Sequence, residues 1–226
     1  MRIIAAFQKD KGISYTSHLD VQRTLQRAFR RANLPLAYTK GYNPHPKLSF
    51  ATALATGFSS DAEWIEVELE TEIEPQAFME RVNTVLPGGL RFHTAFTADE
   101  SIDTLSKLLC SARYIITLHW ETPVSRAALE SAVRDLMNAK EIVVQKKTKS
   151  GIKPTDIRPD IIEAFVTDEA EGPGRIELLG SLTVAGGLRV ETFLNALYER
   201  IGATGFATVH RTALYFTGSD RLPCLS

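Results

Sequence analysis

The chain has 226 residues, 44% of them hydrophobic and 23% charged, so it can bury the core of one large or two small domains. Its net charge of −1 excludes a uniformly basic, nucleic-acid-coating protein, and its two cysteines exclude a disulfide framework or an iron–sulfur cluster held by this chain alone. Without a signal-peptide pattern or an apolar run of roughly 20 residues, we expect a cytoplasmic protein with no membrane span.

The first half of the chain reads as strand, helix, strand, strand, helix, strand. A helix is predicted over Ser17–Asn33, with Ser17 as its N-cap, and its core stripe is Val21, Leu25, Ala28, Phe29 and Ala32. A second helix opens at Pro75, with Phe78, Val82, Val85 and Leu86 inward. Strands are expected over 2–8, 36–39, 48–54, 63–70 and 90–96, the fourth of them half-buried with an acidic outer face.

The second half repeats this order without repeating the sequence. Helices are expected over 125–138 and 190–201, an acidic mobile loop over 168–174, and strands over 113–120, 141–148, 161–166, 175–182 and 207–216. We therefore predict an α+β fold of two tandem ferredoxin-like (β-α-β-β-α-β) units. The first would cover residues 1–98 and the second residues 112–217, with a connector over 99–111.

The charges concentrate around the first helix. Residues 11–50 contain seven Lys or Arg and one acid, whereas residues 51–110 contain eleven acids and three bases. On a helical wheel, one side of the helix, opposite the core stripe, carries Arg23, Arg27, Arg30 and Arg31. Guanidinium groups bind phosphate in a flat, bidentate geometry, so this strip is a candidate anion-binding surface; the alternative is a solvated helix face with Asp20 paired to Arg23.

The segment after this helix is a Pro-stiffened loop rich in basic and aromatic residues. Its candidate ligand-binding residues are Lys40, Tyr42, Asn43, His45 and Lys47. Aromatic rings beside basic groups suit stacked bases with phosphates nearby, and a stiff loop loses little entropy on binding. The alternative is a structural turn whose aromatic side chains pack on the sheet.

Two histidines and a tyrosine are candidates for catalysis. His18 lies in the first turn of the helix on its core-facing side, which favours a buried, hydrogen-bonded role, but it could act as a general acid or base with His45, and Tyr38 could assist. His18, Asp20 and His45 make too weak a pattern for a metal site, so we expect no bound metal or cofactor. The chain contains no Walker-type loop, no dinucleotide-binding glycine motif and no nucleophile elbow.

A second basic patch starts at Lys146 and Lys147 and precedes Asp156–Pro159. It is either an exposed hairpin tip or an additional phosphate contact.

Several of these motifs resemble the radical SAM-linked protein family, a domain of unknown function. The resemblance rests on Ser17–Asp20, Arg27–Ala32, Leu34–Leu36 and Gly41–Phe50, with a second signature at Lys146–Lys147 and Asp156–Pro159. It implies a partner, a B12-binding-type radical SAM protein, that carries the iron–sulfur cluster. The paired ferredoxin-like arrangement is also similar to that of repeat-RNA-processing (RAMP) proteins, at the level of the fold alone.

Three functions follow as hypotheses. The leading one is an accessory RNA-binding module, without catalysis of its own, that serves a radical SAM partner in modification of transfer or ribosomal RNA. The second is a metal-independent, RAMP-like ribonuclease that uses His18 and His45, with Tyr38 or Tyr42 assisting. The third is a protein–protein adaptor in which the arginine strip meets an acidic partner surface.

Overall fold

The computed structural model describes residues 1–99, 101–148, 151–167, 174–218 and 222–224. It shows a mixed α+β fold with a large, mostly antiparallel sheet and few helices. The chain forms two compact units, residues 1–109 with 211–226, and residues 110–210. The division expected from the sequence, at 1–98 and 112–217, stays a prediction about domains.

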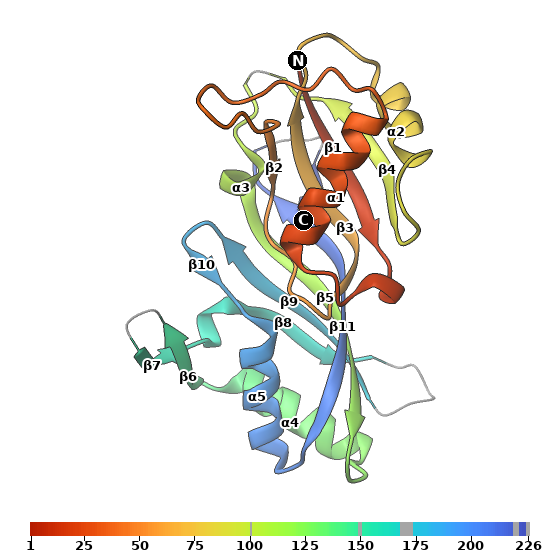
Figure 1. Cartoon of the computed structure of the whole chain (residues 1–226). Coiled ribbons are helices and arrows are strands. Elements are labelled where there is room, and N and C mark those ends of the chain that lie inside the picture. The colour runs from red at the N-terminus through yellow and green to blue at the C-terminus, as the bar shows by residue number, and fades with distance from the viewer. Residues whose placement is uncertain (100, 149–150, 168–173, 219–221, 225–226) are drawn as a thin grey trace. The chain divides into compact units, whose positions relative to one another are not determined.

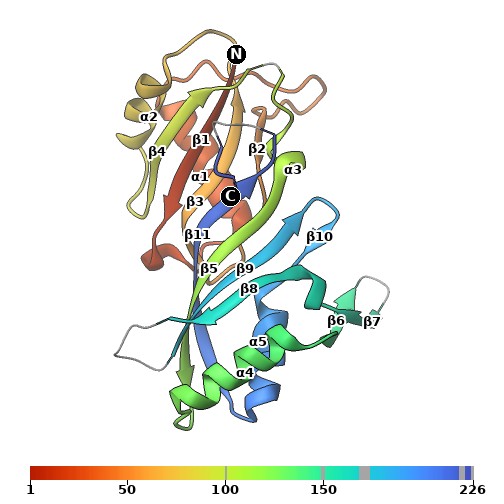
Figure 2. The same cartoon turned by 180° about the vertical axis from the view of Figure 1, so that it is seen from behind.

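The first unit is built on strands in the order β2-β3-β1-β4, all of them antiparallel to their neighbours. Helix α1 lies across one face of β1 and β3 (Figure 1), and the opposite face is turned to the viewer in Figure 2. The elements of this unit before residue 110 are β1 (Arg2–Lys9), η1 (Lys11–Ile13), α1 (His18–Arg31), β2 (Leu48–Phe50), β3 (Ser59–Glu68), α2 (Pro75–Asn83), β4 (Leu90–Thr97) and α3 (Leu105–Leu108).

Helix α1 begins and ends close to where local signals predict. The Ser17 hydroxyl accepts a hydrogen bond from the Asp20 backbone N–H at 3.2 Å, which satisfies one of the free donors of the first turn. The chain then leaves the helix through Asn33, whose φ of 52° is in the left-handed region. The predicted core stripe is buried, and Phe29 packs against Phe78 of α2, with ring centroids 5.7 Å apart.

Three expectations about the strands of this unit are wrong. Residues 36–39 form only isolated bridges, Leu36 with Leu69 and Tyr38 with Pro46, and β2 ends at Phe50 rather than at Leu54. Glu63 and Glu66 of β3 are buried rather than exposed. The sheet's second face is covered as well, since Trp64 packs against Phe216 and the Leu105 N–H donates to Glu66.

The second unit has the predicted helices and an extra hairpin. Strand β9 lies between β5 on one side and β8 and β10 on the other, and α4 packs on α5 and β8 (Figure 2). Strands β6 and β7 form a separate two-stranded sheet. The elements are β5 (Leu109–Trp120), α4 (Arg126–Asn138), β6 (Val143–Thr148), β7 (Gly151–Asp156), η2 (Arg158–Asp160), β8 (Ile161–Val166), β9 (Arg175–Thr183), β10 (Gly186–Gly187), α5 (Val190–Ile201) and β11 (Gly205–Phe216), whose last residues belong to the first unit. The loop expected over 168–174 lies outside the described residues except at Gly174.

Candidate nucleic-acid interface

The four arginines of α1 are all exposed, opposite the buried stripe. Arg23 forms an ion pair with Asp20, since its Nη1 lies 3.3 Å from Oδ1 of Asp20. Within the described part of the chain, Arg27, Arg30 and Arg31 make no ion pair. Their charge therefore faces solvent, and an exposed guanidinium can still bind a phosphate without first breaking an internal contact.

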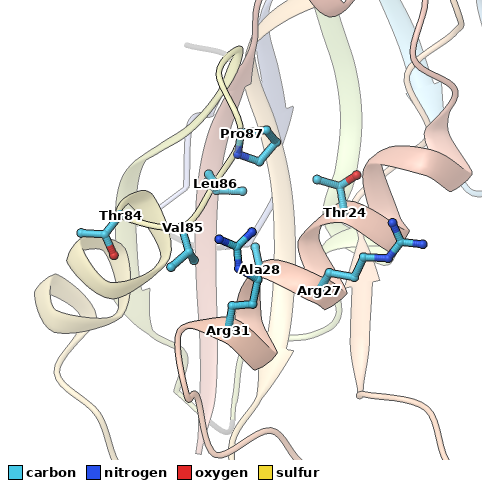
Figure 3. Close-up of a pocket in the computed structure, with 8 residues that line it drawn as sticks. All are labelled: Thr24, Arg27, Ala28, Arg31, Thr84, Val85, Leu86 and Pro87. Atoms are coloured by element: carbon cyan, nitrogen blue, oxygen red, sulfur yellow. The ribbon is translucent and has the colours of Figure 1, made fainter.

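Two of these arginines border a hollow of about 420 Å³ in the first unit. The hollow lies between α1 and the turn that joins α2 to β4, and Figure 3 shows its lining: Thr24, Arg27, Ala28, Arg31, Thr84, Val85, Leu86 and Pro87. The Arg31 side chain reaches toward the turn, while Arg27 extends along α1 on the side of Thr24 (Figure 3). The hollow thus combines two cations with an apolar wall.

The turn that forms this wall is fixed by local hydrogen bonds. The N–H groups of Val85 and Leu86 both donate to the carbonyl of Val82. Gly89, with φ of 90°, packs so closely on Ile13 that a Cβ there would lie 2.9 Å from the Ile13 side chain. Since its carbonyl also accepts from the Asp10 N–H at 2.9 Å, the turn is held to the end of β1. A wall held in this way is largely preformed for a ligand.

The loop after α1 presents its side chains to solvent. The Thr39 N–H donates to the His45 carbonyl at 2.9 Å, and the His45 N–H donates to the Thr39 hydroxyl at 3.0 Å, which closes a tight turn. Tyr42 is fully exposed, and Lys40, Asn43 and His45 are exposed with it. The alternative in which the loop aromatics pack on the sheet therefore does not describe Tyr42, although it does describe Phe50.

Lys47 differs from the rest of the loop. Its Nζ lies 2.5 Å from Oε2 of Glu68 on β3, and the backbone of Lys47 is bonded to both Ala37 and Glu68. The carboxylate neutralises much of its charge. Lys47 is consequently a weaker candidate for an anion than the arginines of α1.

His18 lies over the core rather than in the loop. Its ring packs edge-on against Phe50, with centroids 4.6 Å apart, and burial lowers the pKa of His18, with Arg211 and Lys9 adding to the effect against an opposing contribution from Glu63. The cavity beside it is only about 10 Å³, room for at most one water molecule. His45 lies in the exposed turn with Thr39, and it is not among the described residues that line this cavity.

Three charged residues around His18 escaped the sequence interpretation: Lys9, Glu63 and Arg211. The Lys9 ammonium donates to the carbonyls of Ser14, Thr16 and Phe58, at 2.7, 2.9 and 3.2 Å. All three of its protons are thus used, and burial lowers the pKa of Lys9. The two-residue period of a strand was an available signal, since Glu63 is in phase with Ile65 and Val67.

The second sequence signature holds a hairpin in place. Asp156 Oδ1 accepts from the N–H groups of Ile142 and Arg158, at 2.8 and 2.9 Å, and these two bonds lower the pKa of Asp156. The Arg158 guanidinium donates to the carbonyls of Ile161 and Met137, both at 2.8 Å. Lys146 and Lys147 lie in β6, but their side chains are outside the description. Their role as phosphate ligands stays a prediction.

Neither a metal-binding cluster nor a membrane-spanning helix is found among the described residues. No group of three His, Cys, Asp or Glu side chains there is arranged to hold a metal ion. In the same residues, every helix is too short or too polar to cross a bilayer.

Comparison with known proteins gives one family and a set of related folds. A family described as an uncharacterized protein conserved in bacteria, DUF2344, matches residues 2–189. No curated protein sequence matches the chain. A link to radical SAM proteins is not among these findings, so the radical SAM-linked resemblance is supported only as far as an uncharacterised bacterial family.

Two of the similar solved structures are chains of complexes that contain Cbf5 and Nop10. A chain of a Cbf5-Nop10-Gar1 complex superposes with a TM-score of 0.58 at 12% identity, covering 99% of this chain and 52% of that one. A chain of an archaeal box H/ACA sRNP Nop10-Cbf5 complex gives a TM-score of 0.52 at 10% identity, covering 92% of this chain and 46% of that one. The chain thus spans about half the length of the structures it matches, and the likeness concerns the fold alone.

Proposed function

This chain belongs to the DUF2344 family, described as uncharacterized and conserved in bacteria, and from the charges on its surface we propose that it is an accessory RNA-binding module. It would bind the phosphates of an RNA along α1 and stack bases on the loop that follows.

The arginines near the end of α1 carry charges that no described carboxylate neutralises, and the proposal rests on this. Three exposed guanidiniums, those of Arg27, Arg30 and Arg31, have no carboxylate partner among the described residues. Since all three lie in the last turns of α1, they present positive charge on one exposed side of the helix, where a phosphate backbone can bind. Tyr42, fully exposed in the adjoining loop, adds a ring on which a base can stack.

The fold and the motif resemblance are also consistent with an RNA-related role. One of the similar folds belongs to a complex named as an sRNP. The strand orders β2-β3-β1-β4 and β8-β9-β5-β11 support our proposal that both units are ferredoxin-like. The motif resemblance described above supports a radical SAM protein as the partner, acting on transfer or ribosomal RNA, with its cluster supplied by the partner since this chain has two cysteines.

The test is binding of fluorescent single-stranded RNA to the full chain, followed by anisotropy across a range of salt concentrations. We expect affinity to fall with salt, and the double variant Arg27→Ala/Arg30→Ala to weaken binding and to reduce the salt slope by about one unit per lost phosphate contact. The matched control removes two exposed charges from the second unit, in Arg134→Ala/Lys140→Ala. Absence of binding even at low salt would contradict the proposal.

The same experiment separates the alternatives. The ribonuclease hypothesis predicts cleaved RNA, and cleavage that stops in His45→Ala; the separate surroundings of His18 and His45 do not favour it. The adaptor hypothesis predicts that a radical SAM partner copurifies without RNA and is lost on substitution of Arg27 and Arg30.

A further inference from the structure

The hollow beside α1 differs from a simple basic surface, because only part of its lining is charged. Arg27 and Arg31 supply the cations, while Ala28, Val85 and Leu86 supply apolar groups from two different elements. Its volume of about 420 Å³ falls within the ordinary range of small-molecule sites. A site for phosphates alone needs no such apolar wall.

The two arginines stand one helical turn apart on α1, and like charges at this spacing destabilise a helix. Neither side chain is neutralised by a carboxylate within the described chain. An anion held between the two guanidiniums removes this repulsion and gains charge-assisted hydrogen bonds. Figure 3 shows the two guanidiniums on different sides, so a phosphate bound by both requires the exposed Arg27 side chain to turn toward Arg31.

The opposite wall suits a flat, weakly polar group. Val85 and Leu86 are half-buried and Pro87 is exposed, so their apolar surface is accessible from the hollow. Thr24 and Thr84 also border the hollow, but the Thr84 hydroxyl already donates to the Arg81 carbonyl at 2.7 Å. The hydroxyl of Thr24 can bond a sugar or the edge of a base. The wall is held by its bonds to Val82 and Asp10, which lowers the entropic cost of binding.

We propose that this hollow is a mononucleotide subsite, in which Arg27 and Arg31 hold the phosphate and the turn at residues 84–87 holds the base. The inference rests on the proposed RNA-binding function and deepens it: one nucleotide of the strand occupies the hollow. A free nucleotide has the same chemistry and is distinguished by experiment.

The test uses the full chain with two probes, a fluorescent single-stranded RNA of about ten nucleotides and AMP as competitor. We expect AMP to displace the RNA, and adenosine or inorganic phosphate to do so far less well, because each offers half of the contacts. Failure of AMP to compete while the RNA still binds would overturn the subsite and leave the RNA-binding function standing.

Neighbouring arginines provide the matched control. Arg31→Ala should weaken AMP and RNA binding at least about tenfold, whereas Arg30→Ala, the same charge change one residue away but outside the hollow, should change AMP affinity by less than about twofold. Val85→Asn keeps the charge, and should weaken both probes about fivefold without altering the salt slope. Equal losses of AMP affinity in Arg30→Ala and Arg31→Ala, with no change of AMP affinity in Val85→Asn, would show diffuse electrostatic attraction and refute the subsite.

Two other outcomes separate the source of the ligand and its class. Arg31-dependent binding of AMP without any RNA binding supports a nucleotide site and rejects the RNA-binding function. Displacement of AMP by an acidic peptide as effective as unlabelled RNA rejects the nucleotide assignment in favour of a protein ligand.

Discussion

The guanidinium of Arg211 and the carboxylate of Glu63 form a buried ion pair in the first unit, with Nη1 2.9 Å from Oε1 and 3.2 Å from Oε2. The two residues are 148 positions apart in the sequence, and each side chain is only 4% exposed. The pair ties the middle of β11 to β3 close to His18, the first residue of α1, so the stability of this pair bears on the helix that carries the arginines.

Removal of one partner should be severe. Glu63→Gln or Arg211→Met leaves the other charge buried with incomplete compensation, so we expect a loss of about 3–5 kcal/mol in the free energy of unfolding, measured by denaturant titration. The double variant Glu63→Met/Arg211→Met should lose less than the two single losses added together. Single variants within about 0.5 kcal/mol of the unaltered protein would contradict a structural role for the pair.

Lys9 should matter through its three hydrogen bonds rather than through chemistry. Lys9→Met removes donors from the carbonyls of Ser14, Thr16 and Phe58, and should cost at least about 2 kcal/mol of stability. Hydrogen exchange should become faster at residues 10–18, the entry to α1. The control Lys11→Met changes an exposed charge nearby and should leave both measurements unaltered.

His18 should make stability depend on pH. Burial lowers the pKa of His18 below its ordinary 6.5, so the folded protein binds fewer protons than the unfolded chain between the two pKa values. The free energy of unfolding should therefore be highest above pH 6.5, where His18 is neutral in both states. It should decrease as the pH falls from 6.5 toward the pKa of His18 in the folded protein. The difference in unfolding free energy between the unaltered protein and His18→Gln, measured across this range, should show that slope, and a difference that does not change with pH would contradict it.

Arg158 should be important for the hairpin of the second unit. Arg158→Ala removes donors from the carbonyls of Ile161 and Met137, and we expect a loss of about 2 kcal/mol and faster hydrogen exchange in β6 and β7. Unchanged exchange in these strands would show that the signature at residues 156–159 is not what anchors them.

Tyr42 offers a test of the loop that leaves the fold intact. Because its side chain is fully exposed, Tyr42→Ala should change stability by less than about 0.5 kcal/mol. If a base stacks on it, RNA affinity should fall by about 1–3 kcal/mol. Tyr15→Ala is the matched control, since Tyr15 is 85% exposed but lies outside the loop. Equal effects of the two variants on RNA binding would exclude a specific stacking role.

The sequence by itself determined the features that depend on neighbours along the chain. Helix α1 followed from a capping serine, a 3.6-residue apolar period and a proline after its end, and the exposure of its arginines followed from the same period. The exposed loop followed from its prolines and glycine. These signals are local, and the structure retains them because they agree with the packing of the core.

Only the tertiary structure decided which charges are buried and which surfaces meet. The alternation in β3 indicated that Glu66 lies on the face opposite Ile65, but not that Leu105 and Phe216 cover that face. The hollow needs α1 beside a turn more than fifty residues later in the chain, and the Lys47–Glu68 pair depends on how the loop meets β3. Such contacts depend on how whole helices and strands pack, and the local pattern of residues does not predict which distant residues they will contact.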